Sequence, residues 1–342
     1  MSFNFSRLKK TMAVAAVSAA MATGASAQNL SMSSLDASSG TTAFSIAFSE
    51  LVQQNHPYRI QVATGEKATR MAVDAGMGEL DLFLFSAPIT HWMRNKAVMY
   101  KDMDAAPELA SKLRTIMAYP LGAYQFVVWA DSGIESFDDL KGRTLYLGPP
   151  AGAALRVTSG FVEAAAGLKA DADYTASKLD WASGLQAFQD RQVDLYVTPD
   201  NVPSGILMQL AALGEIRILG VDEETLNSDA FEELRKIPGR RMAEIPADVY
   251  GDSQVNTESV HTLATWVGLG THEGLDEEVV YNMTKTLWEN LDSLHDTAKW
   301  MNQITLDTAF TELNAPLHPG AYRYYKEIGV DVPEALIPEG AM

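Results

Sequence analysis

Cysteine is absent from the 342 residues of the sequence. Disulfide bonds, thiol catalysis and cysteine-ligated zinc or iron–sulfur sites are therefore excluded. The six histidines include no two that lie four residues apart, so the common histidine metal motif is absent as well. We expect neither a metal site nor a cofactor.

Positive charge is also scarce. The sequence has 26 lysines and arginines against 44 aspartates and glutamates, which gives a net charge of −18. A surface of that sign repels nucleic acid and anionic lipid, so we expect no nucleic-acid partner. An anionic small molecule can bind only where local hydrogen-bond donors or positive charges overcome the repulsion from the net negative charge of the protein.

Signatures of catalysis are missing too. The chain has no phosphate-binding P-loop, no H-E-x-x-H zinc motif and no G-x-S-x-G nucleophile turn. The glycines between Gly148 and Gly152 do not form the G-x-G-x-x-G dinucleotide pattern. A binding function is therefore favoured over an enzyme, which stays the least favoured alternative.

The first 27 residues have the pattern of a secretory signal peptide. Three basic residues precede an apolar run over Met12–Gly24, and Ala25-Ser26-Ala27 fits the small-residue cleavage pattern. We predict cleavage before Gln28 and export to the periplasm. An amino-terminal membrane anchor is the alternative, although the apolar run is shorter than the roughly 20 residues that span a bilayer.

The mature chain alternates strands and helices. Apolar, β-favouring runs are each followed by a polar or glycine-containing turn and then a helical pattern, which predicts parallel, doubly wound sheets. In the first part we expect strands at 30–35, 58–63 and 81–85, with helices at 43–54 and 64–75. In the later part we expect a strand at 144–147, a helix at 151–166, a helix at 181–190, a strand at 193–197 and a helix at 203–213.

Two long segments predict how these parts are joined. The β-rich stretches at 113–119 and 124–129 cross into a second lobe, and a strand near 262–269 returns to the first, which helices at 276–290 and 292–302 complete. The prediction is an α/β protein with two doubly wound lobes and two crossing segments. Lobe 1 comprises 28–122 plus 262–342, and lobe 2 comprises 123–261.

Ligands of such folds bind where strand ends and helix starts of both lobes face each other. The clearest such turn runs from the strand at 144–147 through Gly148-Pro149-Pro150 into an alanine-rich helix, whose first unpaired N–H groups suit an anion. The candidate ligand-binding residues at these turns are Thr41, Thr42, Thr64, Gly65, Ser86, Gly148, Gly152, Ala153, Thr198, Asp200 and Asn201. Helix capping explains the threonines and Ser86 equally well, and Asp200 or Asn201 either binds a ligand amine or caps the next helix.

Two arginines complete the candidate set. Arg70 and Arg156 lie in the first turns of helices that open at the predicted cleft. A guanidinium there can hold a carboxylate or sulfonate through paired, charge-assisted hydrogen bonds. A solvated helix-surface arginine is the alternative for each.

Several short motifs carry a family resemblance over essentially the whole mature chain. They are Ser39-Gly40-Thr41, Ala63-Thr64-Gly65, Gly78–Leu82, Trp129–Ile134, Leu140–Arg143, Gly148-Pro149-Pro150, Pro316–Ala321 and Tyr324–Gly329. In order and spacing they resemble the periplasmic solute-binding receptors of tripartite ATP-independent (TRAP) transporters, specifically the TAXI branch. The resemblance implies a type II periplasmic binding-protein fold, no chemistry, and delivery of a small anionic or zwitterionic solute to a TRAP membrane permease. It also implies that His318 is structural.

The chain departs from that family at the ligand-facing turns. Ala151-Gly152-Ala153-Ala154 replaces a Gly-Ser-Gly-Thr run, which removes two hydroxyl donors, and Ser86-Ala87-Pro88 replaces Gln-Ser-Asp. Family members bind organic acids and amino acids such as 2-oxo acids or glutamate, and the solute here is expected to differ from glutamate; dicarboxylates and sulfonates also fit. A ligand sensor of the same fold that reports to a receptor kinase is the alternative to a transport receptor.

Overall fold

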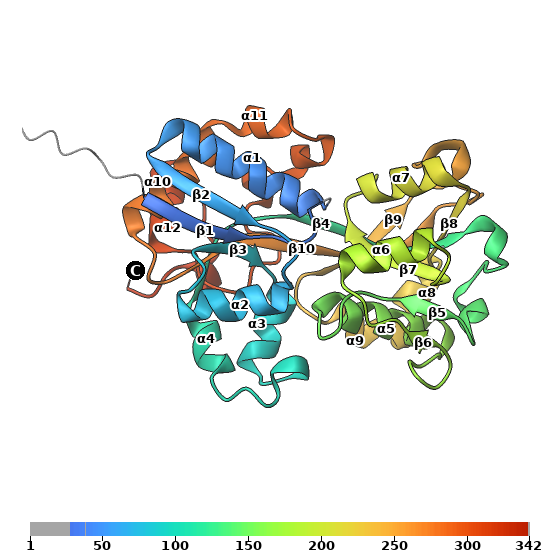
Figure 1. Ribbon diagram of the computed structural model, residues 1–342. Coiled ribbons are helices and arrows are strands. Elements are labelled where there is room, and N and C mark those ends of the chain that lie inside the picture. Colours follow the sequence, from blue (N-terminus) through green and yellow to red (C-terminus); the bar gives the residue numbers. More distant parts are fainter. Residues whose placement is uncertain (1–27, 38, 341–342) are drawn as a thin grey trace, which may run out of the picture.

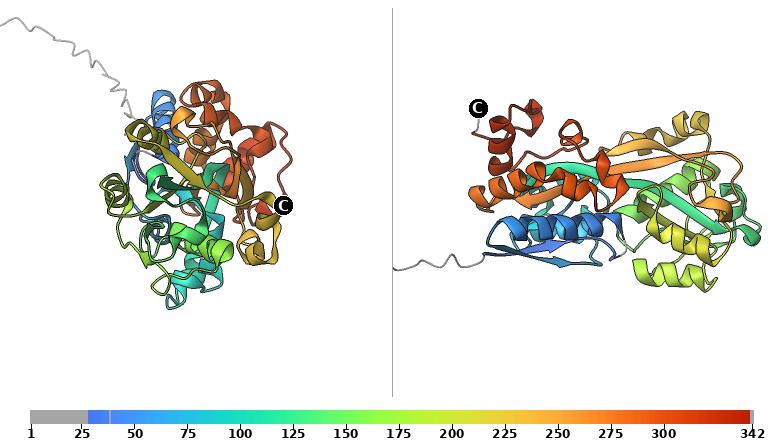
Figure 2. Two further views of the ribbon diagram at one scale, coloured as in Figure 1. Left: turned by 90° about the vertical axis from the view of Figure 1, so that its right-hand side faces the viewer. Right: turned by 90° about the horizontal axis from the view of Figure 1, so that it is seen from above.

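The computed structural model describes residues 28–37 and 39–340, which form two lobes lying side by side (Figure 1). The predicted signal peptide lies outside the described residues. Two long strands, β4 (Leu113–Trp129) and β10 (Val260–His272), run through both lobes and pair with each other in antiparallel register. Figure 2 shows the two strands lying together along the length of the molecule.

Lobe 1 contains the amino-terminal part of the described chain and also the carboxyl-terminal segment, which returns to it. Its elements are β1 (Gln28–Ser33), α1 (Gly40–Asn55), β2 (Tyr58–Ala63), α2 (Ala68–Met77), β3 (Leu82–Phe85), α3 (Ala87–Arg94), η1 (Val98–Tyr100), α4 (Ala106–Lys112), α10 (Glu277–Glu289), α11 (Leu291–His295), η6 (Lys299–Gln303), η7 (Leu306–Thr308), α12 (Pro319–Glu327) and η8 (Glu334–Leu336). One hydrophobic core holds the lobe together, with members between Leu30 and Leu121 and between Val267 and Leu336.

Lobe 2 is built from the segment between the two crossing strands. Its elements are η2 (Ala130–Ser132), η3 (Phe137–Leu140), β5 (Thr144–Tyr146), α5 (Ala153–Ala166), β6 (Thr175–Ala176), α6 (Trp181–Gln189), β7 (Leu195–Asp200), α7 (Gly205–Leu213), β8 (Ile216–Leu219), α8 (Glu223–Asn227), η4 (Asp229–Phe231), α9 (Glu232–Arg235), β9 (Arg240–Ile245) and η5 (Gly251–Ser253).

The core of lobe 2 lies on both faces of its sheet. Successive side chains of a strand point to opposite faces, and β4 divides accordingly: Phe126 and Val128 pack into one cluster, Val127 and Trp129 into the other. Helix α5 covers the first cluster, and α6 and α7 cover the second. A strand buried on both faces explains why β4 reads as a nearly continuous apolar run.

The sheet is mixed rather than purely parallel. Among the described residues its order is β2-β1-β3-β10-β4-β7-β5-β6, with β8 also on β4 and β9 on β10. The pairs β1–β2, β1–β3, β5–β6 and β5–β7 are parallel as predicted, whereas both crossing strands run antiparallel to their neighbours. The parallel strands therefore end at the inter-lobe side in each lobe, and the crossing strands supply the connection.

Three local predictions need correction. Ser39, not Thr41 or Thr42, caps α1, because the Ser39 side chain accepts the Thr42 N–H. The predicted turn at Thr198–Asn201 is largely strand, since β7 pairs with β4 as far as Asp200 and the cap of α7 is Ser204. The helix expected over 292–302 is only the short α11 followed by 3-10 turns.

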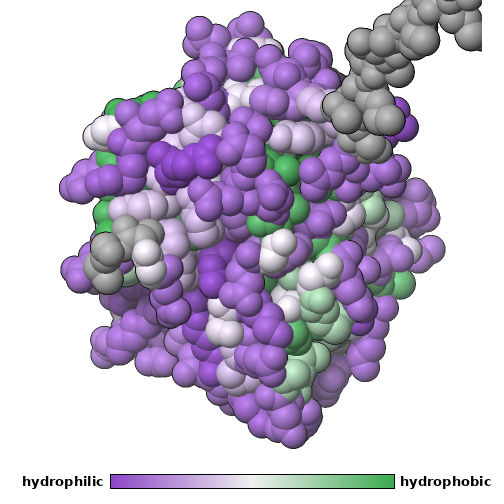
Figure 3. All heavy atoms as spheres, turned by 90° about the vertical axis from the view of Figure 1, so that its left-hand side faces the viewer, coloured by the Kyte–Doolittle hydropathy of each residue, from purple (hydrophilic) through white to green (hydrophobic). Residues whose placement is uncertain are grey.

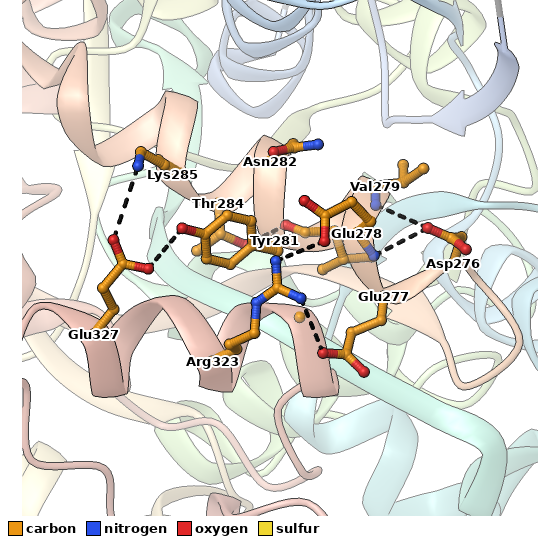
Figure 4. Close-up of polar contacts among 12 residues, drawn as sticks. Asp276, Glu277, Glu278, Val279, Tyr281, Asn282, Thr284, Lys285, Arg323 and Glu327 are labelled. Atoms are coloured by element: carbon orange, nitrogen blue, oxygen red, sulfur yellow. Dashed lines mark hydrogen bonds and ion pairs between the residues drawn. The ribbon is translucent and has the colours of Figure 1, made fainter.

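Helices α10 and α12 pack closely against each other on lobe 1. A Cβ at Gly320 would lie 2.2 Å from the backbone oxygen of Glu277, so only glycine permits this approach. Figure 4 shows Arg323 from α12 reaching α10, where its guanidinium lies 3.7 Å from the centroid of the Tyr281 ring and bonds to Glu277 and Glu278. The outer end of this lobe is mostly hydrophilic, with apolar side chains in small separate patches (Figure 3).

His318 fixes the start of α12. It is 1% exposed; its Nδ1 accepts the Gly320 N–H at 3.2 Å, and its Nε2 donates to the Leu275 carbonyl at 3.0 Å. These two bonds together require the neutral tautomer with hydrogen on Nε2. Burial is the main cause that lowers the pKa of His318 to about 4.

We therefore expect stability to fall in acid because of His318. An unfolded histidine titrates near pH 6.5, so between about pH 6.5 and pH 4 the unfolded chain binds more protons than the folded one. The contribution of neutral His318 to the free energy of unfolding is complete above about pH 6.5, the unfolded pKa. It is lost as the pH falls towards 4, which lowers the free energy of unfolding by up to roughly 3 kcal/mol. The unfolding free energy of His318→Asn, measured in urea from pH 7 to pH 4, should fall less steeply than that of the original protein.

The matched control is His91→Asn, at an exposed position of α3. That variant should keep the original pH dependence. An unchanged slope for His318→Asn would show that other groups cause the acid sensitivity.

Candidate functional site

A cavity that is partly open to solvent lies between the lobes; its space, with that open part included, is about 530 Å³. Lobe 1 and the segment that returns to it contribute Leu35, Lys67, Ala68, Leu84, Ser86, Ile89, Leu121 and Val267. Lobe 2 contributes Tyr124, Pro149, Gly152, Ala153, Ala154, Trp181, Pro199 and Arg240, and Thr265 comes from the returning strand β10.

Three helices begin at this cavity, and no side chain caps any of them. Their N-cap residues are Lys67 for α2, Ser86 for α3 and Gly152 for α5, and none makes a side-chain hydrogen bond to the helix start. By contrast, Ser39, Asp180, Ser204 and Asp276 cap α1, α6, α7 and α10 with their side chains. The first N–H groups of a helix carry partial positive charge, so three uncapped starts favour an anion in the cavity.

Arg240, the first residue of β9, is the most unusual side chain of the cavity wall. It is 7% exposed, and its guanidinium lies 5.4 Å from the centroid of the Tyr124 ring. Its Nη1 donates to the Thr265 hydroxyl, whereas Nε and Nη2 have no hydrogen-bond partner among the described residues. Nε and Nη2 share one edge of the guanidinium plane, and that edge matches the two oxygens of a carboxylate.

The charge of this wall is positive. Arg240 and the half-buried Lys67 line the cavity, and no aspartate or glutamate is among the described lining residues. Burial lowers the pKa of Arg240, yet a guanidinium remains protonated in proteins. The arrangement thus supplies the local donors that an anion needs in a chain of net charge −18.

The cavity contains three of the residues predicted from the sequence. Ser86, Gly152 and Ala153 line it together, from the starts of α3 and α5. Gly148 is adjacent in the turn, with φ +110°, and packs against the first residues of α5. Thr64 and Gly65 line a separate, open hollow beside Glu66 and Glu79.

The two predicted arginines are not in the cavity wall. The Arg70 side chain is 57% exposed and pairs with Asp74 one turn further along α2, 2.7 Å away. Arg156 is exposed on α5. Neither is among the residues that line the cavity. The carboxylate role assigned to them from the sequence fits the position of Arg240 better.

Thr41, Thr42 and Thr198 are also outside the cavity lining. Thr41 and Thr42 are buried in the first turn of α1, where the Thr42 hydroxyl donates to the carbonyl of Asp36 at 2.8 Å and lies 3.0 Å from the Ser34 hydroxyl. Thr198 is buried in β7, opposite Gln125 of β4. Their polar groups serve local structure.

Asp200 and Asn201 connect the lobes instead of lining the cavity. The buried Asp200 carboxylate accepts the Ser204 hydroxyl at 2.6 Å, the Asn201 N–H at 2.9 Å and, across the lobe boundary, the Gly40 N–H at 3.3 Å. Burial raises the pKa of Asp200, against these hydrogen bonds. At the same point β4 passes so close that a Cβ at Gly122 (φ +113°) would lie 2.0 Å from the Asp200 carbonyl oxygen.

Reasoning from the sequence missed Arg240. The residue follows Ile237-Pro238-Gly239 and belongs to no motif quoted for the family resemblance. Its partners Tyr124 and Thr265 lie on the two crossing strands, far away in sequence. The only signal in the sequence is an arginine at the start of a short β-favouring stretch. A charged residue at the start of a strand is common, so this signal does not indicate a binding site.

Among the described residues, no helix combines the length and hydropathy needed to cross a membrane. Nor does any group of three or more histidine, aspartate or glutamate side chains within 28–37 and 39–340 have the arrangement of a metal site.

Comparison with known proteins identifies relatives of this fold. A family model described as the NMT1-like family matches residues 95–329. The periplasmic binding protein BugD is similar in structure, with a TM-score of 0.53 and 13% identity over 89% of this chain and 98% of that one. This likeness confirms the predicted fold class, a type II periplasmic binding protein with two α/β lobes.

Two further structures show weaker likenesses. A TRAP periplasmic solute binding protein from Shewanella oneidensis with bound succinate has a TM-score of 0.46 and 12% identity, over 88% of this chain and 91% of that one. The periplasmic aliphatic sulphonate binding protein SsuA from Escherichia coli has a TM-score of 0.41 and 15% identity, over 90% of each chain.

The unpartnered edge of Arg240 leads to a prediction about stability. A buried charge without a full set of partners is costly, and its replacement by an apolar side chain of similar length is often neutral or stabilising by about 1–4 kcal/mol. In thermal unfolding without added solute, Arg240→Met should therefore melt at the same temperature as the original protein or higher.

Arg114 provides the control. It pairs with Glu273 at 2.8 Å and donates to the carbonyls of Ser111 and Leu113. Arg114→Met should lower the melting temperature because it removes satisfied bonds. A comparable loss for Arg240→Met would mean that Arg240 serves the fold.

Proposed function

This chain belongs to the NMT1-like family, and from that premise we propose that it is an exported solute-binding receptor for a small organic acid. The solute binds between the lobes, the lobes close around it, and the closed form is recognised by a TRAP membrane permease of the TAXI type. The proposal includes cleavage before Gln28, location in the periplasm, and lobes divided at 122/123 and 261/262. It includes no enzymatic step.

One observation carries the proposal: the wall of a cavity between two lobes contains a buried arginine, and two of its guanidinium nitrogens have no hydrogen-bond partner among the described residues. Arg240 and Lys67, with the uncapped starts of α2, α3 and α5, make this cavity attractive to an anion. A solute that contacts both lobes at once stabilises the closed arrangement, because it binds that arrangement more tightly than the open one. Cross-lobe hydrogen bonds from Gly40 to Asp200 and from Thr69 to the Ala151 carbonyl are available in the closed form.

Thermal unfolding with a panel of acids tests the binding step. The panel comprises aliphatic and aromatic monocarboxylates, dicarboxylates, 2-oxo acids, alkyl sulfonates and amino acids. A solute present at a hundred times its Kd adds roughly 2.7 kcal/mol to stability, which raises the melting temperature by several degrees. We expect such a shift with at least one class of organic anion. No shift with any member would contradict the proposal.

Variants then locate the site. Arg240→Met should abolish the rise in melting temperature on addition of the solute. Arg240→Lys should weaken binding at least tenfold, because lysine keeps the charge but lacks the two parallel N–H donors of the guanidinium. The sequence-predicted arginines give matched controls: Arg70→Met and Arg156→Met should bind as the original protein does. Weaker binding in the controls and normal binding in Arg240→Met would return the carboxylate role to the sequence-predicted pair.

Transport is tested in cells of the host. Deletion of the gene should abolish uptake of the solute identified by thermal unfolding, and uptake should return with the original chain but not with Arg240→Met. Normal uptake in the deletion strain would favour the sensory alternative.

Mass spectrometry of the exported protein should give a chain that begins at Gln28.

A further inference from the structure

We propose that the solute is a carboxylate on an apolar carbon skeleton that carries no ammonium group, so that the receptor rejects α-amino acids. This inference rests on the proposed function, because it specifies which organic acids the same cavity accepts. Three features of the wall support it: where the hydrogen-bond donors lie, what the remaining wall is made of, and which groups the wall lacks.

The polar groups with the clearest role lie around Arg240. Its free Nε–Nη2 edge offers two parallel N–H donors for one carboxylate. Thr265, 2% exposed, accepts from Nη1 of the same guanidinium, which leaves its own hydroxyl hydrogen free to donate. The guanidinium also lies over the ring of Tyr124, 5.4 Å from its centroid. These groups define one binding point for an anionic head group.

The rest of the wall is predominantly apolar in both lobes. Lobe 1 presents Leu35, Leu84, Ile89, Leu121 and Val267, and lobe 2 presents Pro149, Ala154, Trp181 and Pro199. A hydroxylated skeleton would lose water here without regaining its hydrogen bonds. An aliphatic or aromatic skeleton gains free energy from the same contacts.

The wall lacks what an ammonium group needs. No aspartate or glutamate is among the described residues that line the cavity. The nearby Asp200 carboxylate is outside the lining and already accepts three hydrogen bonds. An ammonium buried in this cavity would meet Arg240, Lys67 and three helix starts, all of the same sign. Burying a charge without a partner of opposite sign is costly, so the amine is excluded.

Matched pairs of acids test the inference, because each pair differs only by the amino group. The pairs are 4-methylpentanoate with L-leucine, 3-phenylpropanoate with L-phenylalanine, and glutarate with L-glutamate. Thermal unfolding and isothermal titration of the purified chain with each compound should show binding of at least one of the first two deaminated acids. Its amino acid should bind at least a hundredfold more weakly. Glutarate should bind more weakly than the apolar acids.

A pair of variants at Ser86 tests the electrostatic cause. Ser86 lines the cavity as the N-cap of α3 without a capping bond, and both aspartate and asparagine are good N-cap residues, so both variants should fold. Ser86→Asp places a negative charge in the wall and should weaken binding of the deaminated acid at least tenfold. Ser86→Asn has the same shape without the charge, so Ser86→Asp should bind the deaminated acid at least tenfold more weakly than Ser86→Asn does.

The outcomes separate the two proposals. Equal or tighter binding of an amino acid than of its deaminated partner would overturn this inference while leaving the receptor proposal intact. So would preferred binding of glutarate, or equal effects of Ser86→Asp and Ser86→Asn. Failure of every acid to bind would instead overturn the receptor proposal itself.

Discussion

The antiparallel pairing of β4 with β10 is the constraint on which the molecule depends. Each strand contributes to both lobes, so the sheets of the two lobes are continuous through this pair. The pair also determines where the cavity forms, because Leu121, Tyr124, Thr265 and Val267 lie where the strands pass from one lobe to the other. Arg240 is held at this place because β9 pairs with β10 opposite Thr265. The cavity wall is thus assembled on the part of the fold that both lobes share.

The charge of the cavity wall is opposite in sign to the net charge of the chain. In a chain with a net charge of −18, the wall carries an arginine, a lysine and three helix starts, and no carboxylate from the described residues. Elsewhere the chain caps its long helices with serine, aspartate or histidine. The contrast separates helices whose first N–H groups are used for stability from helices whose first N–H groups remain available to a ligand.

The sequence predicted the lobes and part of the cavity, but not its principal charge. Long β-rich stretches predicted the crossing segments, and the glycine-containing turn before α5 holds Gly152 and Ala153, which line the cavity. The place of Arg70 near a helix start predicts a ligand role, but Asp74 lies four residues later on the same helix surface and pairs with it. Arg240 was missed because Tyr124 and Thr265, which orient it, come from distant strands. Helix starts are local in sequence, whereas a side chain's surroundings in a cavity depend on tertiary structure.

The edge of Arg240 that has no hydrogen-bond partner among the described residues has a consequence for the proposed transport cycle. The Arg240 guanidinium is buried, and no described residue supplies an acceptor for its Nε or Nη2. In the proposed binding cycle, a carboxylate between the closed lobes would give this desolvated charge its missing bonds, and closure without a solute would leave them unmade. Under the proposed function, the group that binds the solute would thus also disfavour closure of the empty receptor. The proposed permease, if it recognises the closed form, would then seldom engage a receptor without solute, and little of the ion gradient that drives it would be spent on empty cycles.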